Sequence, residues 1–241
     1  MTQTPHRPQS DPKAGLAGQR ALVLGVSHGV GPEVVSALKD AGVRLALDAP
    51  LVDGAVIVAG EDPVGLVAAA AHALGGLDIL VLCPPPVRNK PVMDWTAEEM
   101  RAVVESELTV SALQMQAAAR LMSGAGHGRI ISILSMSGKT GVHEGVAPYA
   151  AAKAGMLGYM RVLAAETANH GVTVNGIATA LFEPQTRTMT EEKRARLRHQ
   201  IPVGRFGKSV EAAHAVLYLA SPLAAFVTGE CLNLSGGRFM D

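Results

Sequence analysis

A tyrosine and a lysine spaced four residues apart, in the stretch Tyr149-Ala150-Ala151-Ala152-Lys153, have the strongest chemical potential in this sequence. On a helix this spacing puts the phenol and the ammonium on one face. A nearby cation favours the phenolate, so we expect Lys153 to lower the pKa of Tyr149 from its usual value near ~10. Such a tyrosine acts as a proton donor or acceptor near neutral pH. An amphipathic helix that carries both residues by chance is the alternative interpretation.

A glycine-rich turn lies far upstream, at Gly25-Val26-Ser27-His28-Gly29-Val30-Gly31. An apolar strand pattern ends at Gly25, and a helical pattern begins near Glu33. Glycine allows a tight turn and close approach of the backbone, and a helix N-terminus binds phosphate groups. The turn therefore favours a dinucleotide site. Its spacing is Gly-x3-Gly-x-Gly rather than Gly-x-Gly-x-x-Gly, and a purely structural turn is the alternative.

The composition argues against several classes of function. Lys+Arg and Asp+Glu balance at 21 each and aromatic residues make up 3% of the 241 residues, so nothing points to nucleic acid. The two cysteines, Cys83 and Cys231, form neither a disulfide framework nor a metal pair, and the histidines show no ligand spacing. No apolar run reaches the length of a membrane span, and the first residues lack the apolar core of a signal peptide. We therefore expect no metal and no membrane association, and a cytoplasmic protein.

The pattern of short apolar runs and alanine-rich runs predicts an α/β fold. Apolar strands that alternate with helices indicate a parallel sheet covered on both faces, hence a doubly wound sheet. Residues 1–14 are expected to form a disordered tail and residues 15–241 one domain. Strands are expected at 20–25, 43–47, 55–59, 77–82, 129–134, 172–177 and 231–234, and helices at 33–40, 64–74, 97–122, 149–170 and 210–219.

The order of these motifs resembles that of the short-chain dehydrogenase/reductase family over roughly residues 14–241. Besides the glycine turn and the Tyr149–Lys153 pair, the resemblance rests on 77–81, 128–135, 174–175, 201–207, 218–222, 227–230 and 235–237. It implies a single-domain Rossmann-type fold and an NAD(P)-dependent oxidoreductase that interconverts a carbonyl and a secondary alcohol of a small-molecule substrate. It also implies a homodimer or homotetramer built through the helices at 97–122 and 149–170.

The resemblance assigns the catalytic roles. Ser135 would hydrogen-bond the substrate oxygen, with Ser137 as the alternative serine. Tyr149 would transfer the proton, and Lys153 would lower the tyrosine pKa and bind the nicotinamide ribose. Glu107 falls where the family has a water-holding asparagine. We expect it to be buried or water-linked and to pair with Lys153, although a buried anion also opposes tyrosinate formation.

The cofactor contacts follow from the same resemblance. Asp48 ends the second strand, where an acid accepts from the ribose 2′-hydroxyl and repels a 2′-phosphate, so NAD is favoured over NADP. The full set of expected cofactor contacts is Gly25, Ser27, His28, Gly29, Val30, Gly31, Asp48, Tyr149, Lys153, Ile177 and Thr179.

Several family features are altered, which marks a divergent member. Prolines 84–86 replace the usual segment after the fourth strand, the connection 48–54 lacks a helix, and Thr179-Ala180 replaces a Pro-Gly pair. The segment 181–200 is charged and expected to be a mobile substrate-covering loop. Two alternatives therefore stay open: a lyase, isomerase or dehalogenase that needs no nucleotide, and a non-catalytic subunit.

Overall fold

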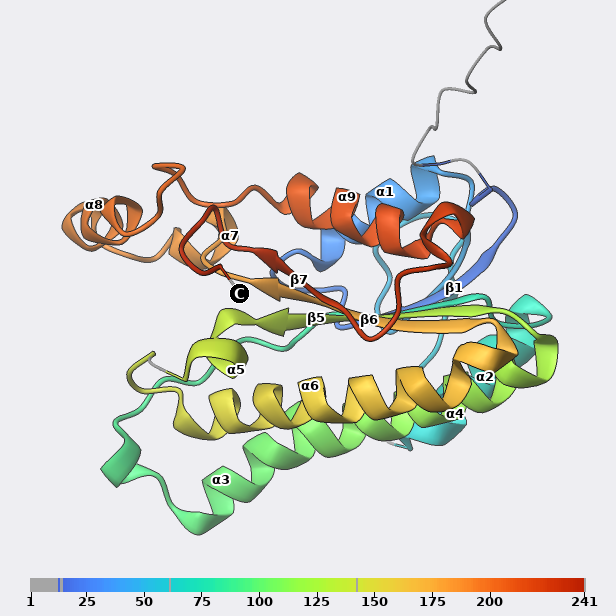
Figure 1. Cartoon of the computed structure of the whole chain (residues 1–241), viewed down its shortest axis with the longest axis horizontal. Coiled ribbons are helices and arrows are strands. Elements are labelled where there is room, and N and C mark those ends of the chain that lie inside the picture. Colours follow the sequence, from blue (N-terminus) through green and yellow to red (C-terminus); the bar gives the residue numbers. More distant parts are fainter. Residues whose placement is uncertain (1–12, 14, 61, 142, 241) are drawn as a thin grey trace, which may run out of the picture.

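The computed structural model describes residues 13, 15–60, 62–141 and 143–240, and their strands form one parallel sheet. Its seven strands are ordered β3-β2-β1-β4-β5-β6-β7, as expected for the doubly wound fold (Figure 1). Nearly all of the predicted tail 1–14 lies outside the described residues. The strands are β1 Arg20–Leu24, β2 Arg44–Leu47, β3 Val56–Ile57, β4 Ile79–Leu82, β5 Gly128–Ser135, β6 Val172–Thr179 and β7 Cys231–Leu234.

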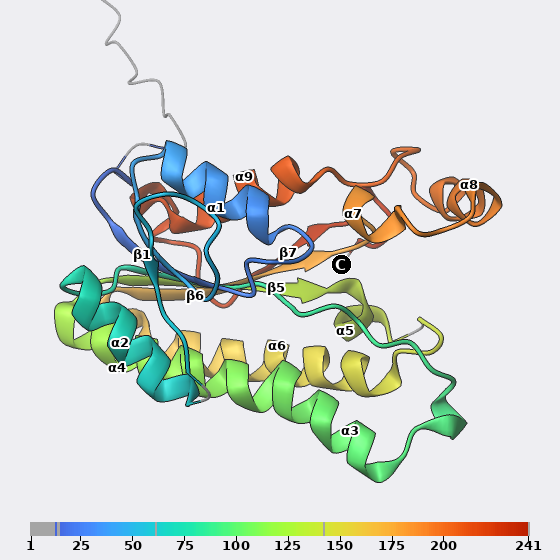
Figure 2. The same cartoon turned by 180° about the vertical axis from the view of Figure 1, so that it is seen from behind.

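Helices cover both faces of the sheet. Figures 1 and 2 show α1 and α9 on one face, and α2, α4 and α6 on the other. The α-helices are α1 Gly31–Asp40, α2 Pro63–Leu74, α3 Ala97–Val104, α4 Val110–Ala125, α5 Met136–Thr140, α6 Ala147–Thr167, α7 Glu183–Thr186, α8 Glu191–His199 and α9 Ser209–Ala220. The other helical turns are η1 Val92–Asp94, the π-helix η2 Glu105–Thr109, η3 Ala168–His170 and η4 Pro222–Ala224.

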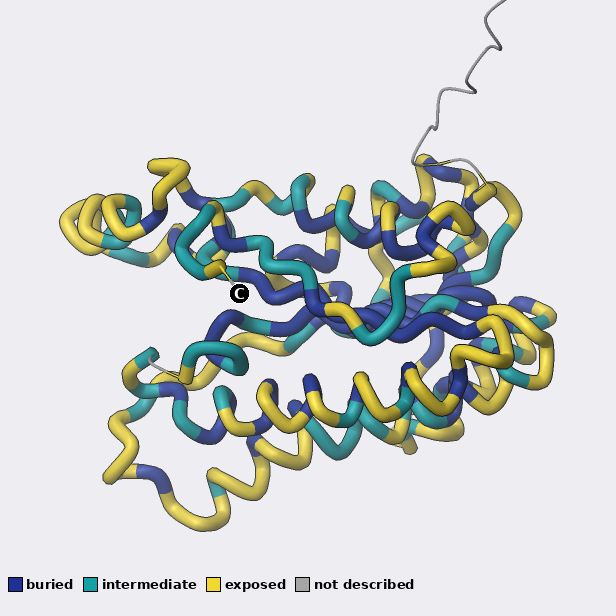
Figure 3. Tube along the Cα trace, viewed as in Figure 1, coloured by how far each residue is buried: buried dark blue, intermediate teal, exposed yellow. Residues whose placement is uncertain are grey.

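The apolar core has two halves, one on each side of the sheet (Figure 3). Every residue of β4 is buried, as expected for a central parallel strand with helices on both faces. Its alternate side chains enter opposite halves: Leu80 and Leu82 pack under α2, α4 and α6, whereas Ile79 and Val81 pack under α1 and α9. This double burial fixes the register of β4, since a slip by one residue would exchange the two sets.

Three predictions about the elements were wrong in detail. The expected helix 97–122 is two helices, joined by the π-helix at Glu105–Thr109. The strand expected at 55–59 shrinks to Val56–Ile57 at the sheet edge. The segment 181–200 is not a continuous loop: it holds α7 and α8, and Thr190 caps α8 by accepting from the backbone N–H of Lys193. Capping by a threonine side chain lets so short and polar a helix form.

All strands run parallel, so their carboxyl ends meet at one edge of the sheet. The chain order reverses between β1 and β4, and ligands of open α/β sheets bind in the crevice beside such a point. The turn after β1, Ser135 at the end of β5 and Thr179 at the end of β6 all lie along this edge. The fold therefore directs the predicted site residues to one end of the sheet.

A polar cluster around Asp78 joins the strands at the opposite end of the sheet. Its carboxylate accepts from the backbone and side chain of Arg20 at 2.6–2.8 Å and lies 2.7 Å from His127 Nε2. These contacts join the amino ends of β1, β4 and β5. Burial alone would raise the pKa of Asp78, but the hydrogen bonds from Arg20 and His127 outweigh burial and lower the pKa to about 2.

Replacing Asp78 should therefore destabilise the fold. We expect Asp78→Ala to lower the free energy of unfolding at pH 7 by about 2–4 kcal/mol, because it leaves the hydrogen-bond donors of Arg20 without their acceptor. The depressed pKa stabilises the native state above the unfolded-state pKa near ~3.9, and this contribution is lost as the pH falls toward 2. Urea unfolding at pH 7 and pH 3 should show a smaller variant effect at pH 3. The exposed Asp53→Ala is the control, and equal losses in the two variants would contradict the account.

Candidate active site

Tyr149 and Lys153 lie in the first two turns of α6, where their side chains share a face. Pro148 occupies the helix start, where its missing N–H costs nothing. Both residues are buried, with relative exposures of 6% and 3%, and Lys153 Nζ lies 5.5 Å from the centroid of the Tyr149 ring. The phenol packs in a small apolar cluster with Trp95, Val103 and Val146. The helical pairing predicted from the sequence is thus present.

The structure brings Ser135, rather than Ser137, to the tyrosine. Ser135 ends β5 and accepts the backbone N–H of Ser137 at 3.1 Å, and its side chain is near enough to the Tyr149 phenol to lower the tyrosine pKa. The Ser137 hydroxyl instead lies 2.9 Å from Nδ1 of His143. No sequence pattern indicates this serine–histidine contact, because His143 lies in an irregular loop without periodicity.

Glu107 lies directly behind Lys153. Its relative exposure is 4%, and its Oε2 atom is 2.9 Å from Lys153 Nζ, which makes a buried ion pair. Apart from this ion pair, Oε2 has no hydrogen-bond partner among the described residues. The residue sits in the π-helix η2, an irregularity common at functional sites. The expected pairing with Lys153 is therefore observed, and the spare acceptor capacity suits a water molecule.

The expected lowering of the tyrosine pKa is wrong for this arrangement. Burial raises the pKa of Tyr149, the Glu107 carboxylate raises it further, and the Ser135 hydrogen bond lowers it only in part. Lys153 is paired with Glu107, so its charge does not act on the phenol alone. At neutral pH Tyr149 is therefore a protonated phenol, the form that donates a proton.

The glycine turn has the shape that a phosphate-binding turn requires. Gly25 has φ +75°, and a Cβ at this position would collide with the carbonyl oxygen of Cys83. Gly29 has φ +59° and open space around the position of an added Cβ, so a ligand can approach its backbone closely. Gly31 begins α1, and the Val30 side chain makes no capping hydrogen bond there. Ser27 and His28 are exposed beside this uncapped helix N-terminus. These features fit the phosphates of a dinucleotide.

Asp48 faces the glycine turn from the end of β2. Its carboxylate accepts the backbone N–H groups of Gly25 at 2.6 Å and Val26 at 3.2 Å. Its negative charge thereby stands directly beside the glycine turn. Asp48 holds the turn in shape, a role that sequence alone did not show.

The two remaining residues that were expected to contact the cofactor, Thr179 and Ile177, lie in different places. Thr179 ends β6 in register with Ser135, and its hydroxyl donates to the carbonyl of Leu134 at 3.1 Å. Ile177 lies inside the sheet with no exposed surface, paired with strands on both sides, rather than at the edge. Cys83 is also buried, and burial raises its pKa to about 12, so it packs as an apolar side chain.

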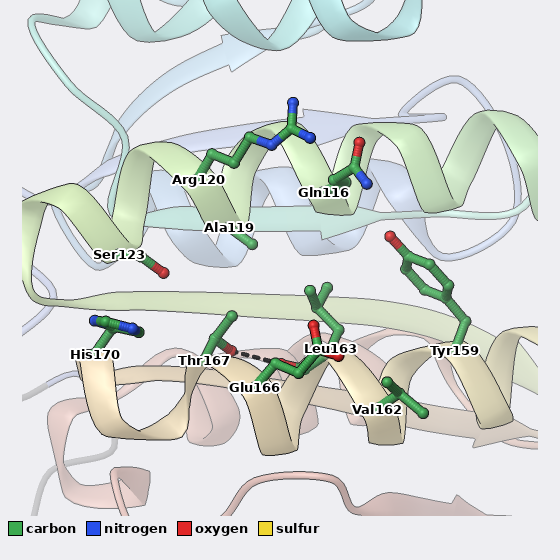
Figure 4. A pocket seen from close by; sticks show the side chains of 10 residues that line it. All are labelled: Gln116, Ala119, Arg120, Ser123, Tyr159, Val162, Leu163, Glu166, Thr167 and His170. Atoms are coloured by element: carbon green, nitrogen blue, oxygen red, sulfur yellow. Dashed lines mark hydrogen bonds between the residues drawn. The ribbon is translucent and has the colours of Figure 1, made fainter.

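A groove lies away from these residues, between α4 and α6. Its volume is about 650 Å³, and none of the predicted site residues lines it. Figure 4 shows side chains of α4 and α6 that line it, among them Arg120, Tyr159 and Glu166. The described residues contain neither a helix that could span a membrane nor a cluster suited to a metal ion.

Comparisons with known proteins identify the family of this chain. The family model described as enoyl-(acyl carrier protein) reductase matches residues 58–238. The 3-oxoacyl-[acyl-carrier-protein] reductase FabG of Escherichia coli K12 is 36% identical over 92% of this chain and 98% of its own length. The FabG of Vibrio cholerae is 35% identical over 93% and 99%. A solved structure, a putative short-chain alcohol dehydrogenase from Sinorhizobium meliloti 1021, superposes with a TM-score of 0.85 at 33% identity, covering 92% of this chain and 96% of that one.

The chain belongs to the short-chain dehydrogenase/reductase family and is an NAD(P)-dependent oxidoreductase. The relatives at this level of identity are reductases by name. This finding favours the oxidoreductase hypothesis over the nucleotide-free and non-catalytic alternatives.

The position of Glu107 predicts a measurable change in Tyr149. We expect Glu107→Gln to lower the pKa of Tyr149, because the substitution removes the carboxylate that opposes ionisation of the phenol. NMR titration of ¹³Cζ-labelled tyrosine, assigned with Tyr149→Phe, measures the pKa.

Glu166→Gln is the matched control, since Glu166 raises the pKa of Tyr159. It should lower the pKa of Tyr159 and leave Tyr149 unchanged. A Tyr149 pKa that does not respond to Glu107→Gln would contradict the proposed coupling.

Proposed function

We propose that this enzyme reduces the ketone of a 3-oxoacyl thioester to a secondary alcohol through Ser135, Tyr149 and Lys153. The observation that carries the proposal is the convergence of the Ser135 hydroxyl and the Lys153–Glu107 pair on one buried phenol. The acyl-carrier-protein reductases among the relatives support the thioester as the substrate class.

Each residue has a distinct role in this proposal. Ser135 donates a hydrogen bond to the ketone oxygen, where negative charge develops as the carbonyl is reduced. Tyr149 gives its proton to that oxygen, and its raised pKa keeps the phenol protonated until then. The nicotinamide cofactor supplies the hydride to the carbonyl carbon when it is bound. The high tyrosine pKa therefore suits reduction better than alcohol oxidation.

Lys153 and Glu107 act behind the tyrosine. Lys153 is close enough to hold the phenol in place, and its ammonium has donors left for a ribose hydroxyl. Beside its ion pair with Lys153, Oε2 of Glu107 can accept from a water molecule, which would return a proton to Tyr149 after each turnover. We propose Glu107 as a positioning residue that acts through Lys153.

We propose NAD(H) as the preferred cofactor, held by the turn Gly25–Gly31. The Asp48 carboxylate beside Gly25 and Val26 would repel the 2′-phosphate of NADP(H). We also propose a homodimer or homotetramer that uses the α4 and α6 faces. The groove between these helices is partly apolar, with Val162 at 59% exposure, so a second copy would remove it from water.

The proposed roles predict a graded loss of activity with acetoacetyl thioesters and NADH. Tyr149→Phe should lower kcat about a thousandfold, since it removes the proton donor. Ser135→Ala should lower kcat about a hundredfold, since it removes one donor to the ketone oxygen. Absorbance of NADH at saturating substrate follows the reaction.

Ser137→Ala is the control, because the Ser137 hydroxyl contacts His143 rather than Tyr149. Its kcat should stay close to that of the wild type. Full activity of Tyr149→Phe, or equal losses of activity in the two serine variants, would contradict the proposed catalytic roles.

The Asp48 geometry predicts the cofactor preference. Wild-type enzyme should bind NADH more tightly than NADPH, and Asp48→Asn should reduce this ratio about tenfold by removing the charge while keeping one acceptor oxygen. Fluorescence titration with both cofactors gives the ratio. The exposed Asp53→Asn should leave it unchanged, and a preference that Asp48→Asn does not alter would refute this role.

A further inference from the structure

A second cavity lies on the segment that follows β6, and arginines dominate its lining. Its volume is about 320 Å³. The residues around it are Glu183, Thr186, Arg187, Arg194, Arg198, Arg205 and Phe206. Four guanidinium groups from three separate stretches of chain thus converge on one small space.

The walls of this arginine pocket are joined by backbone contacts. Phe182 and Gly207 form a parallel bridge, and the N–H of Glu183 donates to the carbonyl of Gly207 at 2.9 Å. The side chains of Phe206 and Thr186 are buried, with exposures of 4% and 1%. The pocket therefore has a fixed base rather than being a chance gathering of surface arginines.

Carboxylates compensate the arginines only in part. Arg205 makes a bidentate pair with Glu211 at 2.6 and 2.9 Å, and Arg198 pairs with Glu191. Arg194 Nε is 3.7 Å from the same Glu191, buried and without a hydrogen-bond partner in the described chain.

Arg187 makes neither an ion pair nor a hydrogen bond with any described residue, and it is exposed at the rim. Even with Glu183 counted in the lining, the four guanidinium groups outnumber the carboxylates that line or pair with them. The donors of Arg187 and Arg194 therefore remain available to an anion.

We propose that this arginine pocket binds the phosphate of a phosphopantetheine-type thioester, and this inference rests on the proposed function. Guanidinium forks match phosphate oxygens with paired, charge-assisted hydrogen bonds. The pocket follows directly on Thr179, which is in register with Ser135, so a thioester at Tyr149 could extend its carrier arm toward it. Arg187 and Arg194 supply the free donors and set the specificity for phosphate-bearing substrates.

The test compares two substrates that carry the same acyl group. Acetoacetyl-coenzyme A has phosphates, whereas acetoacetyl-N-acetylcysteamine has none. Arg187→Ala and Arg194→Ala should each raise KM for the coenzyme A thioester about tenfold. They should leave kcat, and KM for the phosphate-free thioester, unchanged. Arg196→Ala is the matched control, since Arg196 is exposed on α8 outside the pocket. Equal KM changes for both substrates, or none, would overturn the proposal.

A binding experiment separates this proposal from the proposed function. Calorimetry with the Tyr149→Phe enzyme measures the affinities for coenzyme A and for inorganic phosphate without turnover. The proposal requires coenzyme A binding that weakens about tenfold on adding Arg187→Ala. If coenzyme A binding weakens in this way while wild-type enzyme reduces neither thioester, the phosphate-binding pocket is supported and the proposed function is wrong. If coenzyme A binds no more tightly than inorganic phosphate, the site is one for free phosphate and the substrate role is overturned.

Discussion

The buried ion pair between Lys153 and Glu107 is the constraint on which the rest of the site depends. Neither charge can lose its partner without leaving the other uncompensated in a low-dielectric interior. The pair therefore fixes α6 against the π-helix η2 and, with α6, the position of Tyr149. Burial of the phenol raises the tyrosine pKa most, and the carboxylate behind the lysine raises it further, so that the phenol stays protonated. A site of this kind is set to donate a proton, which is the requirement for reducing a ketone.

The sheet supplies the remaining geometry. Because all strands are parallel, Ser135, Thr179 and the glycine turn meet at one edge, while Asp78 joins the other edge. The turn is held by the Asp48 carboxylate, so one acid both shapes the backbone of the glycine turn and places a negative charge beside it. Chemistry at one edge and structural ion pairing at the other explain why polar residues can be buried at both ends of an apolar sheet.

Much of this could be predicted from the sequence, since strands buried on both faces and a four-residue helical spacing are local patterns. The sheet and the pairing of Tyr149 with Lys153 belong to this group, whereas the contact of Glu107 with Lys153 was expected from the resemblance to the family. The interruption of the long helix at 105–109 could not be predicted, because helical periodicity continues across it. The direction of the Tyr149 pKa shift could not be predicted either, because it depends on the sum of burial, the Glu107 charge and the Ser135 hydrogen bond in three dimensions. The arginine pocket joins residues from separate segments, and only tertiary structure brings them together.

The central claim is that Tyr149 protonates a ketone to which a nicotinamide cofactor delivers hydride. The most direct measurement is isotope transfer. NADH carrying deuterium at C4 is incubated with acetoacetyl thioester and enzyme, and the deuterium content of the product is measured by mass spectrometry. The account predicts one deuterium on the new carbinol carbon with wild-type enzyme and almost no product with Tyr149→Phe. A product free of deuterium from either C4 face, or a labelled product formed equally well without the tyrosine hydroxyl, would contradict it.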